Sequence, residues 1–110
     1  MFEIGARVIA RWENHDRPGI ITEVTRVHDG LDDAVYTVRG LLTDMWVGPE
    51  DIQSDPTPTP AVGQHWRTLL TGREATVLVV LDLLRAEVKV DGDRVCTVCL
   101  SSLGWELVSA

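Results

Sequence analysis

The sequence predicts an all-β protein made of two small units that are joined by a proline-rich linker. Apolar residues make up 45% of the chain. Many of them stand in short runs rich in valine and isoleucine, which favour strands. Prolines alternate at positions 56, 58 and 60, where they exclude both a helix and a central strand. Because the segments before and after these prolines share several residues at matching positions, we interpret them as one unit that occurs twice.

The proline run is expected to be a semi-rigid spacer. Proline fixes its own φ and restricts the preceding residue to extended geometry. Residues 55–61 should therefore form a short connection of the polyproline-II type, with the first unit at residues 1–54 and the second at residues 62–110. A PxxP recognition motif is the alternative interpretation of the same prolines, but the flanking repeats favour the spacer.

The first unit is expected to alternate strands with turns. Its strands are predicted from period-two alternation and β-branched residues, and the first loop from a polar segment that ends in Pro-Gly. Proline followed by two acidic residues predicts one 3₁₀ turn that places Ile52 in the core. The predicted strands cover residues 4–12, 20–27, 34–39 and 41–47, with the long loop at 13–19, a tight turn at 28–33 and the 3₁₀ turn within 48–52.

The second unit is expected to repeat this plan. Residues 62–68 begin as residues 4–10 do, 58 positions later. Residues 75–84 are almost entirely apolar, which predicts a strand buried on both faces; a short helix over residues 80–84 is the alternative. The remaining predictions are a loop at 69–74, a hairpin between strands 86–90 and 95–99, a match of 98–103 with 47–52, and a last strand at 105–108.

This order of elements resembles that of an SH3-like barrel. Several segments of the first unit are also similar to the Tudor and KOW branch of that fold: Gly5-x-Arg-Val-x-Ala10, Gly19-Ile-Ile, Tyr36-x-Val38 and Trp46-Val-Gly-Pro-Glu-Asp-Ile52. The second unit resembles small barrels of actinobacterial and actinophage proteins, by its Val62-Gly-Gln-x-Trp66 opening and its Leu103-Gly-x-Glu-Leu-Val108 ending. The resemblance implies two tandem SH3-like barrels and supplies no active site.

Charge and hydropathy argue against two classes of partner. The net charge is −7, and residues 1–55 carry five arginines against eleven acidic residues. Nucleic-acid binders need a basic face that displaces counterions from phosphate, so no nucleic-acid partner is expected. The sequence has no apolar run of about 18 residues and begins without a signal-peptide pattern. No membrane partner is therefore expected, and the expected location is the cytoplasm or a virion.

The motifs of common catalytic and metal sites are missing from the sequence. Cys96 and Cys99 form one CxxC, but a zinc site needs about four ligands, and residues three apart on a strand face opposite sides. We therefore expect two ordinary thiols. Ser101 and Ser102 have no recognisable base, and phosphate-loop, GxGxxG and HExxH patterns do not occur. The expectation is a protein that is not an enzyme and has no metal or cofactor.

The candidate binding site is an aromatic surface on the first unit. Trp12 lies where the first strand meets the long loop, and Tyr36 and Trp46 lie on later strands. In SH3-like domains this side of the barrel binds peptides or methylated side chains, and a carboxylate such as Asp44 would attract a cation to the rings. The competing interpretation places Tyr36 and Trp46 in the core or between the units.

A second candidate surface lies on the apolar strand of the second unit. Only one face of that strand can point into its own core, so Leu78 and Val80 are predicted to contact the first unit or another chain. We expect a non-catalytic protein-interaction module whose partner is a protein or a second copy. The alternatives are a structural virion component, such as a head–tail joining or decoration protein, and an acidic inhibitor that imitates nucleic acid.

Overall fold

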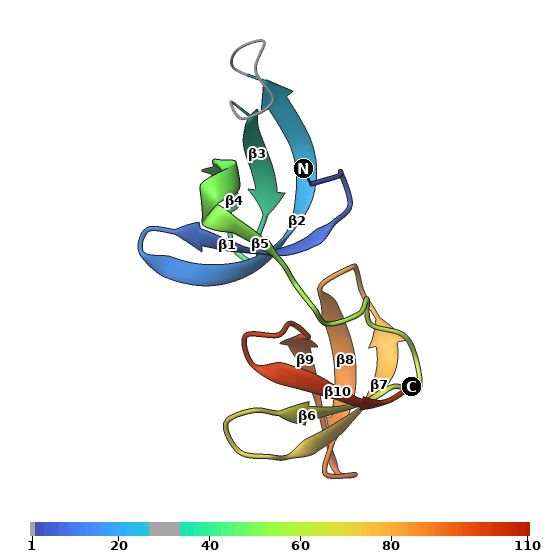
Figure 1. The fold of residues 1–110 in the computed structure, drawn as a ribbon. Helices are drawn as coiled ribbons and strands as arrows, with labels where there is room; N and C mark the ends of the chain where they lie inside the picture. The colour runs from blue at the N-terminus through green and yellow to red at the C-terminus, as the bar shows by residue number, and fades with distance from the viewer. Residues whose placement is uncertain (1, 27–33) are drawn as a thin grey trace. The chain divides into compact units, whose positions relative to one another are not determined.

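The computed structural model describes residues 2–26 and 34–110. Within these residues the protein is all-β, with two five-stranded antiparallel sheets and one 3₁₀ turn. The chain divides into two compact units, Met1–Asp55 and Pro56–Ala110, and each contains one of the sheets (Figure 1). The tight turn predicted at residues 28–33 lies outside the described residues.

The first unit contains five strands in the spatial order β4-β3-β2-β1-β5. β2 bends sharply: its first half pairs with β1 and its second half with β3 (Figure 1). The predicted strand at residues 34–39 and the predicted 3₁₀ turn are both confirmed. The elements are β1 (Arg7–Trp12), β2 (His15–Arg26), β3 (Ala34–Arg39), β4 (Asp44–Val47), η1 (Pro49–Asp51) and β5 (Ile52–Ser54).

The long loop predicted at residues 13–19 is wrong. β1 and β2 are joined by a two-residue turn, and both turn residues, Glu13 and Asn14, have positive φ (52° and 66°). Such a turn matches the twist of the flanking strands. Pro18 lies inside β2 opposite Ile9, where β2 has not yet paired with β3. Because β2 has only one neighbour at that point, the missing N–H of proline is tolerated.

The core of the first unit surrounds Tyr36. Its side chain is buried, the Phe2 ring packs on it in a perpendicular arrangement with 5.7 Å between centroids, and its hydroxyl accepts a hydrogen bond from the Phe2 N–H. Gly19 admits the Val38 side chain so closely that a Cβ at position 19 would collide with it. The other buried apolar residues packed here are Val8, Ala10, Ile21, Ala34, Met45, Val47 and Ile52.

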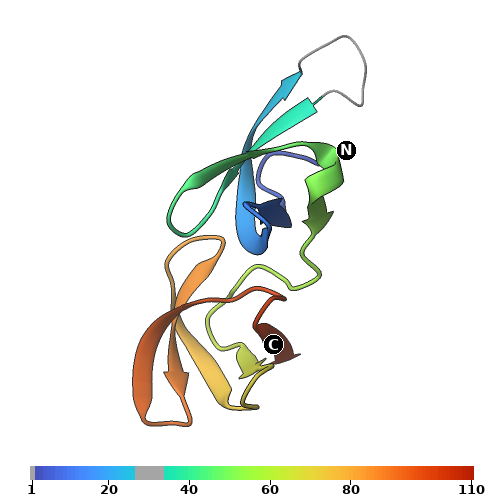
Figure 2. The same ribbon diagram turned by 90° about the vertical axis from the view of Figure 1, so that its left-hand side faces the viewer.

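The second unit has the same topology as the first. Its strand order is β10-β6-β7-β8-β9, so β6 to β9 correspond to β1 to β4 and β10 corresponds to β5 (Figure 2). The hairpin predicted around Asp91-Gly-Asp-Arg94 is confirmed. The strands are β6 (His65–Thr68), β7 (Glu74–Val80), β8 (Arg85–Val90), β9 (Arg94–Cys99) and β10 (Trp105–Ser109).

The repeat extends to individual backbone hydrogen bonds. Gly5 donates its N–H to Ile21, and Gly63 donates its N–H to Val77 in the same way, at 2.7 and 3.0 Å. Both glycines have a φ of about 90°, which only glycine adopts at little cost. The strand that accepts this hydrogen bond, β2 in the first unit and β7 in the second, contains a β-bulge, with one extra residue after Ile21 and one after Val77.

The two cores exchange a large residue for a small one at matching positions. Through the shared register, Val8 corresponds to Trp66 and Tyr36 corresponds to Ala86. All four are buried. The first unit thus fills its core with a large residue from β3, and the second with a large residue from β6. In each core, one of these two positions holds a large residue and the other a smaller one, as close packing requires.

Residues 75–84 do not form a strand that is buried on both faces. β7 ends at Val80, and Leu78, Val79 and Val80 are 40%, 45% and 36% exposed. The bulge is the physical reason, because the extra residue Leu78 breaks the period-two alternation. Beyond the bulge, Val79 pairs with Glu87 and Val80 pairs with the buried Ala86. Leu78 and Val80 therefore do not lie together on one outward side of a regular strand.

The predicted match of residues 98–103 with residues 47–52 is confirmed at its start and wrong at its end. Val47 pairs with Tyr36 and Val98 pairs with the equivalent residue Ala86, but Leu103 does not correspond to Ile52. Ile52 is buried, whereas Leu103 is 44% exposed. Strand pairing shows the correct correspondence: Ile52 pairs with Ala10, and Trp105 pairs with Thr68 at the equivalent position of β6. The buried residues between β9 and β10 are Leu100 and Ser101, so the connection there packs differently from η1.

Asp82 organises the turn between β7 and β8. Its carboxylate accepts the N–H groups of Leu84 and Arg85 at 2.8 and 2.7 Å and the Arg85 Nε–H at 2.8 Å. Burial raises the pKa of Asp82, but these hydrogen bonds and the Arg85 charge outweigh it, so the pKa lies below its ordinary value. The resulting stabilisation is complete above the pKa of an unfolded aspartate and is lost as the pH falls through the folded value.

We expect Asp82→Ala to lower the free energy of unfolding by about 1 kcal/mol at neutral pH, a small value because the carboxylate is partly exposed. The difference from the wild type should shrink as the pH falls to about 3. Urea unfolding across this pH range measures it. Asp82→Asn is the matched control, since it keeps an acceptor for both backbone N–H groups and should cost less than Asp82→Ala. A pH-independent difference would contradict this assignment.

Candidate functional site

Two tryptophans form an exposed aromatic pair on the first unit. Trp12 ends β1 and Trp46 lies on β4, and their ring centroids are 6.3 Å apart in an edge-on arrangement with an interplanar angle of 63°. Trp46 is 59% exposed, whereas its neighbours on β4, Met45 and Val47, are buried. The alternation of β4 therefore turns the Trp46 ring out of the core, and Trp12, which is half-buried, supports it from beside the core.

Asp44 lies on the same outward side of β4 as Trp46, two residues before it. Its carboxylate is 3.9 Å from Nε of Arg39, its partner in the β3–β4 ladder. Both side chains are largely exposed, so this ion pair contributes little stability and can open. A carboxylate next to an exposed indole is an arrangement that attracts a cationic group.

An apolar groove of about 480 Å³ lies on the same unit, and neither tryptophan lines it. It lies between the start of β2 and the β3–β4 turn. His15, which is the cross-strand partner of Trp12, forms part of one wall, and Leu42, which is 95% exposed, forms part of the other. The remaining lining residues are Arg17, Pro18, Gly40, Leu41, Thr43 and Met45.

Of the predicted site residues, the structure brings together Trp12, Trp46 and Asp44 but not Tyr36. Tyr36 lies in the core, with only 2% of its surface exposed, and cannot contact a ligand in this state. The sequence contained a signal for this: Tyr36 has the same period-two phase as Ala34 and Val38. The groove, with Leu42 in its wall, was not predicted, because residues from segments far apart in the sequence line it.

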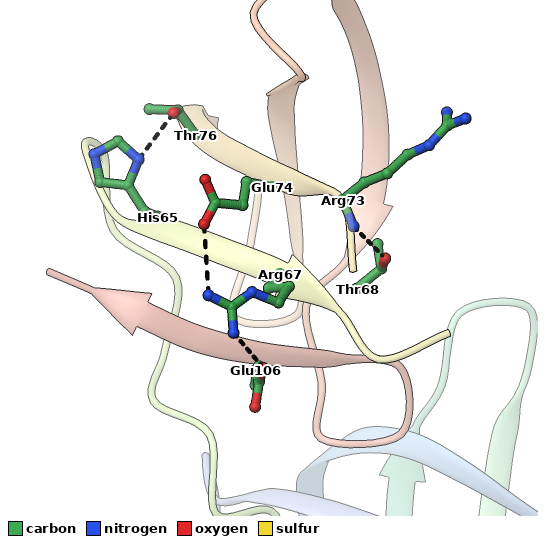
Figure 3. Close-up of polar contacts among 7 residues, drawn as sticks. All are labelled: His65, Arg67, Thr68, Arg73, Glu74, Thr76 and Glu106. Atoms are coloured by element: carbon green, nitrogen blue, oxygen red, sulfur yellow. Dashed lines mark hydrogen bonds and ion pairs between the residues drawn. The ribbon is translucent and has the colours of Figure 1, made fainter. Parts of the chain in front are cut away.

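The second unit presents a polar surface on β6, β7 and β10 (Figure 3). Arg67 is 3.5 Å from Glu74 on β7 and 3.2 Å from Glu106 on β10, and His65 shares a hydrogen bond of 3.1 Å with Thr76. These side chains are mostly exposed and satisfy one another across neighbouring strands. Such a ladder stabilises the sheet modestly and has the character of a solvated face rather than a binding site.

Cys96 and Cys99 form no disulfide, and they face opposite sides of β9. Across residues 2–26 and 34–110, no group of three or more His, Cys, Asp or Glu side chains is arranged to hold a metal ion. The same residues contain no helix with the length and apolar character needed to cross a membrane.

No family model matches the chain, and no curated protein matches it significantly.

Proposed function

We propose that the chain is a non-catalytic protein-interaction module made of two SH3-like barrels, and that the first barrel binds its partner through Trp12, Trp46 and the apolar groove of the same unit. The strand order shared by both units and the 3₁₀ turn between β4 and β5 support the barrel assignment. So does the contact between β1 and β4, which are not neighbours in the sheet and meet only if the sheet curls.

The observation that carries the proposal is the exposure of the Trp46 ring. An indole that is 59% exposed contributes little to its own core, whereas tryptophan is the residue type most enriched among the energetic anchors of protein interfaces. The groove on the same unit supplies apolar surface, and the acidic first unit with Asp44 favours a cationic partner. The expected ligand is therefore a peptide segment with apolar and basic residues.

The test is selection of peptides from a random display library on the whole chain, followed by calorimetry with the best synthetic peptide. Trp46→Ala should weaken binding at least about tenfold, the loss typical of an interface anchor. Asp44→Asn should weaken it less and reduce its salt dependence. Leu70→Ala, an equally simple change at a residue that is 94% exposed on the second unit, is the control and should leave binding unchanged. Equal affinity of Trp46→Ala and wild type, or the failure to select any peptide, would refute the proposal.

A further inference from the structure

The two sheets end in four edge strands, and three of them carry features that prevent another strand from adding. β5 has only three residues and leads into Pro56, and β4 has four residues and leads into Gly48-Pro49. β10 contains an irregularity between Leu107 and Ser109. Short edges, prolines and bulges are the usual means by which proteins protect a sheet edge.

β9 lacks these features. It has six residues, pairs with β8 along its whole length without a register shift, and contains no proline, no lysine and a single charged residue, Arg94. Its outer edge is the end of the sheet. Val95 is 56% exposed, and Thr97 is also exposed. An edge of this length with an unbroken register and one charged residue at its end is a template for another strand.

The register shows which backbone groups lie at this edge. Leu100 donates its N–H to the Leu84 carbonyl, which fixes the phase of the ladder. In an antiparallel pair, residues whose N–H and C=O groups point toward the partner strand alternate with residues whose groups point away from it. Even-numbered residues of β9 therefore bond to β8. The N–H and C=O groups of Val95 and Thr97 point away from it, toward the open side.

The dipeptide Val-Cys stands on both sides of Thr97, as residues 95–96 and 98–99. If a second copy of the strand runs antiparallel with Thr97 at the centre, Thr97 faces Thr97, Val95 faces Cys99, and Cys96 faces Val98 of the second copy. No charged residue faces another charge, and every pair is β-branched or small, as cross-strand packing favours. The second unit carries five basic against six acidic residues, so electrostatic repulsion between two copies of this unit is small.

We infer that two copies of the chain associate through antiparallel pairing of their β9 strands, with the two-fold axis at Thr97. The pairing is isologous and closed, because it uses both open edges and leaves none for a third copy. Only one strand from each copy forms the contact, so the dimer belongs to the weak class of interfaces. This interface is independent of the aromatic surface on the first unit.

The first test is sedimentation equilibrium of the whole chain from low-micromolar to high-micromolar concentration. The wild type should approach the mass of a dimer, and Thr97→Pro should weaken the dimer at least about tenfold. Proline is tolerated in β9 itself, since the Thr97 N–H points away from β8, but it removes a donor from the new ladder. Thr97→Val keeps the backbone and should dimerise as the wild type does. If Thr97→Pro loses the circular-dichroism spectrum of the folded chain, Thr97→Lys takes its place.

The second test fixes the register. Val95→Cys would face Cys99 of the second copy, so mild oxidation should link most of the chain into a disulfide dimer, and adding Cys99→Ser should abolish the link. A wild type that remains monomeric at the highest concentration would overturn the inference. So would a dimer that Thr97→Pro leaves intact, a larger assembly, or a Val95→Cys dimer that does not cross-link.

Discussion

Trp66→Ala is expected to unfold the second unit. The Trp66 side chain is fully buried, and its Nε1–H donates to Oε1 of Gln64 at 3.1 Å, the same oxygen that accepts the Ala61 N–H at 2.7 Å. Truncation leaves a cavity and a broken hydrogen bond, which together cost about 3–5 kcal/mol. A unit of this size has a small net stability, so the loss should exceed what is available.

The measurement is a ¹H–¹⁵N NMR spectrum of the whole chain, in which the dispersed signals of the second unit should collapse. Leu70→Ala is the control, because a residue that is 94% exposed should change stability by no more than about 0.5 kcal/mol. A dispersed spectrum for Trp66→Ala, with an unchanged unfolding temperature, would show that the core does not depend on this ring.

The same spectra test the predicted interface at Leu78 and Val80. Both residues are exposed on the second unit, and the expectation from the sequence is that another surface covers them. If the first unit supplies that cover, its signals should weaken together with those of the second unit in Trp66→Ala. Intact first-unit signals would show that the units fold independently and that these residues serve another contact or none.

Arg7→Met is expected to destabilise the first unit by about 3 kcal/mol, because it leaves a buried carboxylate without its cation. Nη2 of Arg7 lies 3.9 Å from Oδ2 of Asp55, and the two side chains are 7% and 0% exposed. The Asp55 N–H also donates to the Arg7 carbonyl at 3.0 Å. The pair therefore fixes the end of the first unit immediately before the proline run.

Arg11→Met is the matched control for Arg7→Met. Arg11 lies on the same strand and forms an ion pair of 3.6 Å with Asp16, but those side chains are 56% and 47% exposed. Such a pair contributes no more than about 1 kcal/mol. The double variant Arg7→Met/Asp55→Leu should recover most of the loss, since replacing both partners of a buried pair is much less costly than removing one. Equal effects of the two arginine substitutions in chemical denaturation would contradict the role given to the buried pair.

Local patterns were enough to predict the strands whose side chains alternate regularly. The strand at residues 34–39 and the 3₁₀ turn at Pro49–Asp51 were predicted because each depends on adjacent residues alone. The segment at 13–19 was predicted wrongly because Pro-Gly normally marks a loop. There the proline is accommodated by a strand that has a single neighbour, which is a property of the sheet and not of the segment.

The candidate site was predictable only in part, for a similar reason. Trp12 and Trp46 are conspicuous in the sequence, and the structure brings their rings together. The phase of β3 should have assigned Tyr36 to the core. The groove could not be predicted, because it requires the start of β2 and the β3–β4 turn to approach each other. The exposure of Val79 depends on the bulge at Leu78, which periodicity does not reveal.

The exchange of large and small residues between the two cores has a consequence for how a tandem repeat avoids misassembly. Neighbouring repeats with one topology can exchange strands while they fold. If β3 took the place of β8, Tyr36 would enter a core that Trp66 already fills, an overpacking that costs about 1–3 kcal/mol. If β8 took the place of β3, Ala86 beside Val8 would leave a cavity that costs about 2–5 kcal/mol. Each hybrid is therefore less stable than the correct pairing, and the difference between the two units directs each strand to its own core.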